Sequence, residues 1–430
     1  MNVQVPAGAT ALAPVAATIG SQTYMSPTLH LVPEMTIEPT QQALTEIEAL
    51  GLASQYDLAN GHASQELAPS QQRIINSLPQ LWQQGASQKS RDAEMMFKNA
   101  FSKLAQAPSL ANYEYYKICP TASNSIDTVA TWLAEKNLST ALIEPTFDNL
   151  YLILKRRGVT LTALPEESLY DGSYATAFKN VDALFLVNPN NPTGKVLNCE
   201  QFAQIVNWCA VNNKVIVMDN TFRFFAQQAY DTYKILLDSG VTFLSIEDTG
   251  KVWPTQEIKA SLLFCSQSIF QEIHIIYDEI FLCASNFALG ILSEFLLDAH
   301  ARGLAKAVWN EVELRRKIFR KAIEGTILGV HQESLPSTIS VEWVQIQSHL
   351  DNDSKLFATG SQPFTSDLEL SAHFNAHNLV LLPGRQFYWS KKGEQAVPDS
   401  VRFALLKPKK EFLAAVDFLG NELRRLQSWL

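Results

Sequence analysis

The sequence is poor in cysteine, carries no excess of positive charge and contains no long apolar run. Its five cysteines are Cys119, Cys199, Cys209, Cys265 and Cys283. None forms a CxxC pair and most lie in apolar stretches, which favours core thiols in a reducing compartment, the cytoplasm. No metal-ligand cluster is evident, and no stretch approaches ~18 uncharged apolar residues. We therefore expect no metal site and no membrane span.

The charge balance and length describe a large globular chain. Lys and Arg number 34 against 43 Asp and Glu, and the resulting net charge of −9 disfavours a nucleic-acid partner. The 430 residues, 47% of them hydrophobic, suffice for a large domain plus a smaller one. The first twenty residues lack the basic segment of a secretory signal, so we expect either a flexible arm there or an extension that packs on a partner subunit.

Short apolar runs alternate with helical periodicity through the middle of the chain. This alternation is typical of an α/β fold with a mostly parallel sheet covered on both faces. The predicted strands are 113–119, 140–143, 183–187, 214–218, 241–246 and 261–265, and the predicted helices are 39–52, 71–84 (broken at Pro79), 91–104, one from Ile126, 149–157, 200–211 and 305–324. Strands at 339–347, 379–382 and 400–405 and a helix over 410–426 indicate a smaller α+β domain.

One run organises the prediction of function: Leu184-Phe185-Leu186-Val187-Asn188-Pro189-Asn190-Asn191-Pro192-Thr193-Gly194. A buried strand ends there in a turn of Asn and Pro, and ligands of open α/β sheets bind at such carboxyl ends. The order Asn-Pro-x-Asn-Pro-Thr-Gly resembles a signature of class I/II aminotransferases, the fold type I enzymes that use pyridoxal 5'-phosphate (PLP). The resemblance implies a three-layer αβα large domain and a smaller α+β C-terminal domain. We predict an N-terminal arm and part of the small domain over 1–65, the PLP-binding domain over 66–305 and the C-terminal domain over 306–430.

The resemblance assigns roles to residues at the neighbouring strand ends. Asp219 matches the acid that keeps the pyridine nitrogen protonated, and Lys251 matches the Schiff-base lysine, which also moves protons. Asn191 matches the donor to the 3'-oxygen of the ring. Phe147 is either the aromatic that stacks on the ring or a core phenylalanine. Arg402 resembles the arginine that grips the substrate carboxylate.

The phosphate site is where the sequence departs from the family. Thr121, Ala122 and Ser123 match its phosphate-binding turn at a helix N-terminus. Thr249 lies in what is usually a serine-rich stretch before the lysine, and Lys259 replaces the usual arginine. Phe222 replaces a tyrosine whose hydroxyl helps to set the protonation of the 3'-oxygen. Cofactor binding survives these changes, but they leave the type of reaction open.

Three functions are therefore considered. The first is a PLP-dependent aminotransferase-like enzyme acting on an α-amino acid, in a homodimer. The second follows from Asn60-Gly61-His62-Ala63, which resembles a stretch of arginine oxidases and capreomycidine-type cyclases. There Glu48 would read a guanidinium, and His62 is either a second acid/base group or a loop histidine. The third, a silent binding module, is opposed by the joint presence of Asn191, Asp219 and Lys251.

Overall fold

The computed structural model describes residues 16–19, 22–25, 43–227, 230–255, 258–330, 339–346, 364, 366–390 and 400–427. The chain forms two compact units, residues 1–42 and 43–430. In the first, β1 (Ala16–Ile19) and β2 (Gln22–Met25) pair as an antiparallel hairpin. Within the described residues, every helix is too short or too polar to cross a bilayer.

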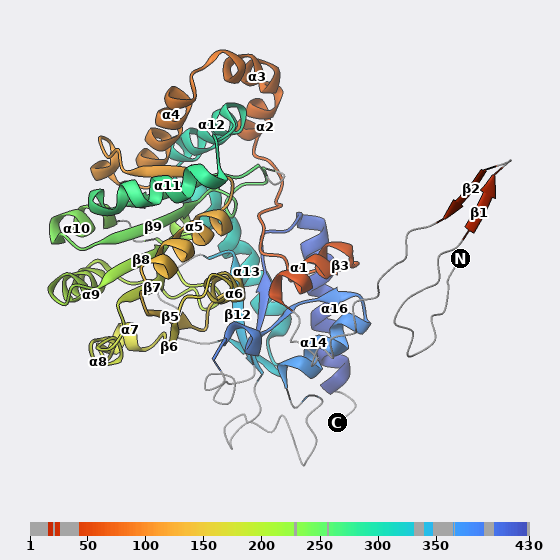
Figure 1. Cartoon of the computed structure of the whole chain (residues 1–430). Helices are drawn as coiled ribbons and strands as arrows, with labels where there is room; N and C mark the ends of the chain where they lie inside the picture. Colours follow the sequence, from red (N-terminus) through yellow and green to blue (C-terminus); the bar gives the residue numbers. More distant parts are fainter. Residues whose placement is uncertain are drawn as a thin grey trace. The chain divides into compact units, whose positions relative to one another are not determined.

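A seven-stranded sheet lies at the centre of residues 43–430 (Figure 1). Its order is β4-β10-β9-β8-β7-β5-β6, and only β10 runs antiparallel to its neighbours. The strands are β4 (Tyr116–Cys119), β5 (Thr140–Glu144), β6 (Leu161–Pro165), β7 (Ala183–Val187), β8 (Val215–Asp219), β9 (Phe243–Asp248) and β10 (Ser261–Cys265). The predicted α/β class with a mostly parallel sheet is confirmed.

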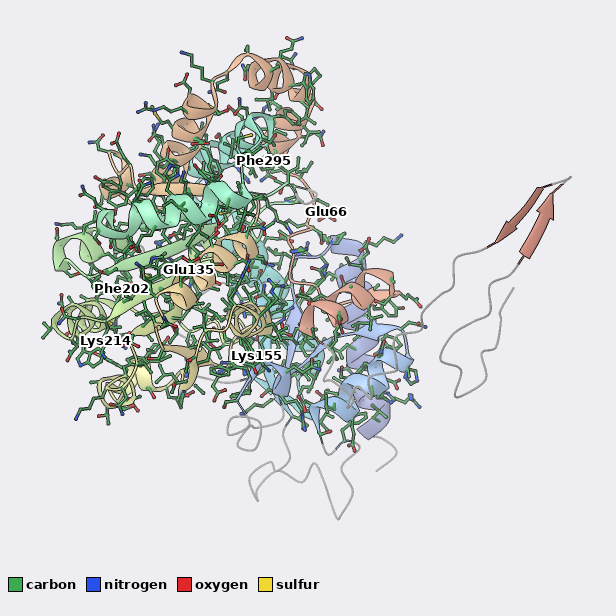
Figure 2. The ribbon with its side chains drawn as sticks, viewed as in Figure 1. Glu66, Glu135, Lys155, Phe202, Lys214 and Phe295 are labelled. Carbon is green, nitrogen blue, oxygen red and sulfur yellow. The ribbon has the colours of Figure 1, made fainter. Side chains whose placement is uncertain are left out.

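Helices cover this sheet on both faces, as the composition of the strands requires. Every residue of β5, β7, β9 and β10 is buried, the pattern of strands with no solvent-facing side. The helices are α2 (Pro69–Asn76), α3 (Leu78–Ser87), α4 (Ser90–Leu104), α5 (Ala122–Glu135), α6 (Asp148–Arg156), α7 (Ser168–Asp171), α8 (Tyr174–Ala177), α9 (Cys199–Val211), α10 (Thr232–Ser239), α11 (Phe270–Ile280) and α12 (Asn286–Arg302). Figure 2 shows the side chains that fill the interior, among them Phe202 of α9 and Phe295 of α12, both fully buried.

The C-terminal part is built on a second, antiparallel sheet in the order β11-β12-β15-β14. Its elements are β11 (Leu328–Val330), β12 (Val341–Ile346), β14 (Leu382–Pro383), β15 (Ser400–Ala404), α13 (Asn310–Ile323), α14 (Asp367–Ala376) and α16 (Lys409–Gln427). The segment α1 (Leu44–Ala53) and β3 (Tyr56–Asp57) joins this part, because β3 pairs in parallel with β13 (Leu379–Val380). The domain boundaries at 65 and 305 stay predictions.

The predicted break at Pro79 is found two residues earlier. The helix expected over 71–84 divides at Ser77, and Pro79 occupies the first turn of α3. A proline is harmless there, because the first N–H groups of a helix have no partner within it.

Candidate active site

The strand registers bring the chemistry-bearing residues to one edge of the sheet. Val187 of β7 pairs with Asp219 of β8, so the two strands end at the same level. The antiparallel β10 starts at that edge, because Ser261 pairs with both Asp248 and Cys119. The segments that follow β4 and β9 and the one that precedes β10 therefore meet beside the ends of β7 and β8.

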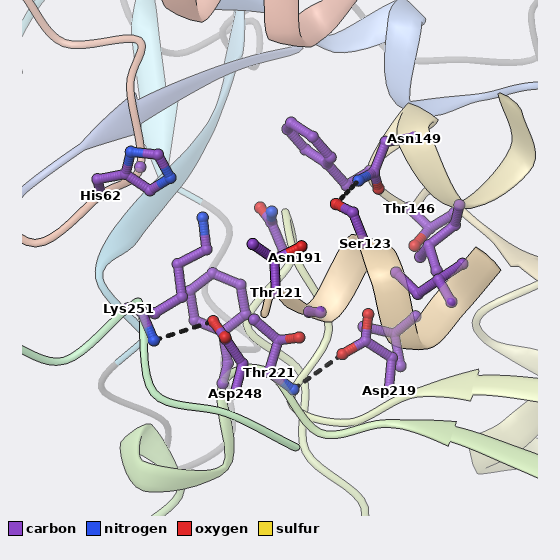
Figure 3. A pocket seen from close by; sticks show the side chains of 18 of the residues that line it. His62, Thr121, Ser123, Thr146, Asn149, Asn191, Asp219, Thr221, Asp248 and Lys251 are labelled. Carbon is purple, nitrogen blue, oxygen red and sulfur yellow. Dashed lines mark hydrogen bonds between the residues drawn. The ribbon is translucent and has the colours of Figure 1, made fainter. Parts of the chain in front are cut away.

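A cavity opens at this edge of the sheet, and polar and charged side chains from several strand ends converge on it (Figure 3). Eleven of the twelve predicted site residues line it: Glu48, His62, Thr121, Ala122, Ser123, Phe147, Asn191, Asp219, Lys251, Lys259 and Arg402. Thr249 lies outside the lining, and its hydroxyl both donates to and accepts from the backbone of Ala260.

Lys251 is a buried amine of weakened basicity. Burial lowers its pKa, and the neighbouring cations Lys259 and Arg402 act in the same direction. The carboxylates of Glu48 and Asp248 oppose that shift. A lysine with a lowered pKa presents more of the neutral, nucleophilic amine near neutral pH.

Asp219 is a buried carboxyl group with no cation among the groups identified as shifting its pKa. It is 6% exposed, and one oxygen accepts a hydrogen bond from the backbone N–H of Thr221 at 2.8 Å. Burial raises its pKa to about 6, against the lowering effect of the Thr221 bonds, and its other identified influences are carboxylates. A protonated ring nitrogen would supply the missing positive charge.

The part of the cavity wall formed by the start of α5 is suited to a phosphate. Helix α5 begins there, with Thr121 as its N-cap and Ser123 in its first turn, and the N–H groups of a helix start attract anions. Lys259 contributes a positive charge, with Nζ 3.2 Å from Nε2 of His62. Gly250 gives this lysine room, because a Cβ at position 250 would lie 2.9 Å from its Cδ atom.

Arg402 and Glu48 form a buried ion pair across the cavity. Arg402 is 1% exposed and donates to Glu48 Oε1 at 2.8 Å, to the carbonyl of Ala59 and to Asn191 Oδ1 at 3.4 Å. Burial opposes the ionisation of Glu48, but the charges of Arg402 and Lys251 and the hydrogen bonds from Arg402 and Gly61 together outweigh it, and the pKa of Glu48 is lowered. The two residues were expected to hold the two ends of a substrate, and in the structure they also contact each other directly.

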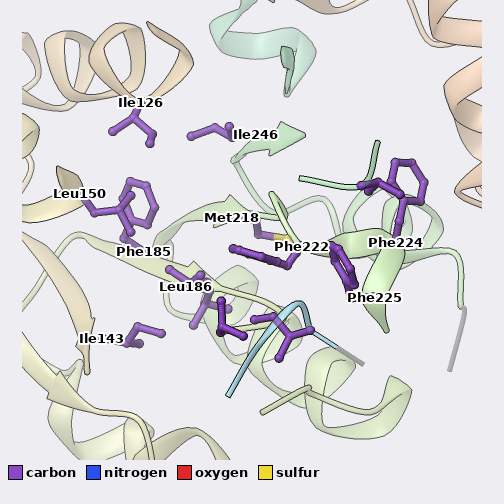
Figure 4. Packing of buried hydrophobic residues seen from close by; sticks show 14 of the residues in the cluster. Ile126, Ile143, Leu150, Phe185, Leu186, Met218, Phe222, Phe224, Phe225 and Ile246 are labelled. Carbon is purple, nitrogen blue, oxygen red and sulfur yellow. The ribbon is translucent and has the colours of Figure 1, made fainter. Parts of the chain in front are cut away.

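Two phenylalanines border the cavity in different ways. Phe147 is partly exposed to it and packs edge-on against Phe387, with 6.1 Å between ring centroids. Phe222 is buried among the aromatic and aliphatic side chains of the core and packs against Phe225 (Figure 4). Position 222 thus brings a ring and no hydroxyl group to the cavity wall.

Sequence reasoning missed Glu166, which holds the Asn/Pro turn in place. It is 1% exposed, and Oε1 accepts bonds from Asn190 Nδ2 and Thr193 Oγ1, both at 2.7 Å. Asn190 Nδ2 also donates to the carbonyl of Pro145, so the turns carrying Asn191 and Phe147 are fastened together. Burial raises the pKa of Glu166 to about 7. Glu166 was hard to find in the sequence, because it follows β6, a strand that was not predicted there.

Asn149 and Thr221 were also missed. Asn149 donates to Ser123 Oγ at 3.2 Å and so orients the first turn of α5. Thr221 follows Asp219 by two residues and donates to it, a spacing that the sequence displays but that has no meaning without the turn geometry.

Comparison with known proteins identifies the family. The profile of "Aminotransferase class I and II" matches residues 89–282. The solved structure of MppP, soaked with the product 2-ketoarginine, is 30% identical and has a TM-score of 0.75, covering 85% of this chain and 99% of that one. Bna3p of Saccharomyces cerevisiae, at 16% identity and a TM-score of 0.72, covers 94% of this chain and 100% of its own; it shows the fold.

Curated relatives match over shorter stretches. Histidinol-phosphate aminotransferase of Clostridium kluyveri is 32% identical over 109 residues, 24% of this chain and 30% of the relative. The enzyme of the same name from Thermococcus gammatolerans is 22% identical over 219 residues, 48% and 60% of the two chains. The chain thus spans less than two thirds of these curated relatives. Its likeness to MppP covers nearly that whole protein, and with it we conclude that the chain belongs to the aminotransferase class I and II family of PLP-dependent enzymes.

Proposed function

We propose that this protein is an aminotransferase-like enzyme that acts on an α-amino acid through Lys251. The observation that carries the proposal is one cavity holding a buried lysine of lowered pKa and a buried aspartate without a cationic partner among its identified influences. Such perturbed groups in one cleft are typical of active sites.

The residues present fit PLP at each of its parts. Asp219 would hold the ring nitrogen, Asn191 the ring oxygen and Phe147 the ring face. The first turn of α5 and Lys259 would hold the phosphate. When bound, PLP supplies an electron sink for charge that develops at the substrate Cα.

The protein's own groups would then bind and orient the substrate. Arg402 would grip the substrate carboxylate; its buried Nε has no hydrogen-bond partner among the described residues, so it retains a donor for an anion. Lys251 would remove the proton from Cα and return it, a role that burial favours because it lowers the pKa of this amine. The ion pair with Glu48 would orient Arg402 before the substrate arrives.

A second candidate is a cyclase or oxidase of an arginine-like amino acid. It is favoured by the similarity to MppP, whose structure was solved with 2-ketoarginine. Glu48 Oε1 accepts bonds from Arg402 and from the Gly61 N–H, whereas its Oε2 accepts none among the described residues. That oxygen is thus available for a substrate guanidinium, and His62 at the cavity wall would serve as a second acid/base group.

Purified holoenzyme should be incubated with a panel of amino acids, with and without a keto acid, while absorbance and product mass are recorded. Transamination requires the keto acid for turnover and yields its amino acid. Oxidation of arginine consumes dioxygen, and cyclisation of a hydroxylated arginine releases water; both proceed without a keto acid and change the product mass. If no amino acid alters the spectrum or is converted, the proposal is wrong.

The predicted homodimer, cytoplasmic location and biosynthetic role stay predictions. Light scattering on the holoenzyme would test the first of these, and a monomeric mass would contradict it.

A further inference from the structure

A cluster of two histidines and a glutamate lies on helices α14 and α16, outside the catalytic cavity. His373 lies in the last turn of α14 and His377, four residues later, is the C-cap residue of that helix, with ring centroids 4.5 Å apart. Glu422 of α16 faces them, and its Oε1 is 2.9 Å from Nε2 of His373. One ligand atom from each of the three residues lies within 4.8 Å of the other two. The cluster could not be recognised from the sequence, because Glu422 is 45 positions beyond His377.

We propose that His373, His377 and Glu422 form a site for a divalent transition metal of the Zn²⁺ type that joins α14 to α16. Two imidazole nitrogens and one carboxylate oxygen are the ligand set that zinc, nickel and copper prefer, whereas Mg²⁺ and Ca²⁺ require oxygen. Two histidines at i and i+4 on one helix are a recurring way to present such ligands. Three protein ligands leave a fourth position for water.

The ligands are already oriented by the groups around them. Nδ1 of His377 lies 2.8 Å from the carbonyl of His373. When that nitrogen donates, the proton sits on Nδ1 and Nε2 keeps the lone pair that a metal needs. Arg425 donates to both oxygens of Glu422, at 2.8 and 2.6 Å, and fixes the plane of the carboxylate. Hydrogen-bonded ligands of this kind are the usual second layer of metal sites.

Metal entry requires the ligand atoms to move in both directions, because their separations range from 2.9 Å to as much as 4.8 Å. Ligand atoms about 2.0–2.1 Å from a tetrahedral zinc lie about 3.3 Å from one another. The contact between His373 and Glu422 is shorter than that, at 2.9 Å, so it would open by a few tenths of an ångström. Arg425 would keep its hydrogen bond to Oε2 of Glu422, and its hydrogen bond to Oε1 would lengthen. The guanidinium limits the affinity, but it does not block the Nε2 atoms.

Titration of EDTA-treated holoenzyme with zinc chloride by calorimetry tests the proposal. We expect one zinc per chain, a rise in melting temperature with zinc and no rise with Mg²⁺. His377→Ala removes an exposed ligand and should weaken zinc binding about tenfold or more, since even the loss of a ligand's hydrogen-bond partner costs 10–100-fold. His274→Ala is the matched control: its Nδ1 lies 3.2 Å from Asp278 at i+4, but among the described residues it belongs to no group of three metal ligands.

Three results would overturn the proposal. The first is a wild-type protein that binds no zinc, and the second is a zinc affinity of His377→Ala equal to that of the wild type. The third is a loss of zinc affinity in His274→Ala as large as that in His377→Ala. His373→Gln provides a second ligand variant, and its loss of zinc binding must accompany that of His377→Ala. Activity of the cofactor-loaded enzyme is not the readout, because none of the three residues lines the catalytic cavity.

Discussion

The buried carboxyl of Asp219 makes a prediction that needs no substrate. In the cofactor-free protein, burial raises its pKa from 3.8 to about 6. The folded protein therefore binds this proton more tightly than the unfolded chain does. The free energy of unfolding must therefore fall as the pH rises from 3.8 to about 6. Above pH 6 the folded protein bears the whole cost of burying the carboxylate. Asp219→Asn removes the charge and keeps an oxygen for the Thr221 N–H.

The size of the effect follows from the shift. A difference of 2.2 pKa units corresponds to about 3 kcal/mol, an upper value for one buried group. An unfolding entropy of about 2.1 cal/mol/K per residue converts this to about 3 °C for a chain of this length. Cofactor-free Asp219→Asn should therefore melt about 3 °C above the wild type at pH 8, and by about half that margin at pH 5.

When PLP is bound, the wild type rather than Asp219→Asn should have the higher melting temperature. With a protonated ring nitrogen beside it, Asp219 is paired, and the neutral asparagine no longer favours that proton. The loaded variant should retain PLP but lose turnover by orders of magnitude. A cofactor-free variant less stable than the wild type at pH 8, or a margin that does not depend on pH, would refute the reasoning. Near wild-type turnover would remove Asp219 from the site.

Three further variants test other parts of the cavity. Glu48→Gln should raise the apparent dissociation constant of arginine-like substrates by about tenfold or more, as read from the cofactor spectrum. The control is Glu46→Gln, on the exposed side of α1, which should leave that constant unchanged. Lys259→Ala should weaken PLP binding in a cofactor titration by about tenfold or more, since a charged hydrogen bond is worth about 1.5–3 kcal/mol; unchanged affinity would remove it from the phosphate site. Glu166→Gln keeps an acceptor for Thr193 and Asn190 and removes a buried charge, so it should raise the melting temperature at pH 8 more than at pH 5. An equal change at both pH values would show that Glu166 does not titrate there.

Strand ends were the most predictable part of this molecule. The runs before Asn188 and Asp219 are continuous and apolar, and the structure has strands of five residues at both. Because parallel strands share a carboxyl edge, the sequence order alone brought Asn191, Asp219 and Lys251 together. Helix starts were less clear: α5 begins at Ala122 rather than Ile126, because Thr121 caps it.

Elements without a periodic pattern escaped prediction. Helix α12 is buried on several sides, with Leu289, Ile291, Leu292 and Phe295 all inside, so it has no polar face to set a period. Strand β6 lies at the edge of the sheet and is half-exposed, with threonine among its residues. Short edge strands of mixed polarity resemble loops in a sequence.

Contacts between segments that are far apart in the chain could not be predicted from the sequence. Glu48 and Arg402 are 354 positions apart, and their pairing depends on how α1 and β15 pack. The link from Glu166 to Asn190 depends on two turns that are adjacent only in the folded chain. Residue types can suggest charges and donors, but which of them meet is decided by tertiary packing.

The central claim is that Lys251, and not the second lysine of the cavity, bonds covalently to the cofactor. The direct measurement is borohydride reduction of the holoenzyme followed by peptide mass spectrometry. The account predicts a single modified lysine at position 251, and a loss of the label in Lys251→Ala while that variant remains folded. Label on Lys259, or a reducible band that persists in Lys251→Ala, would contradict it.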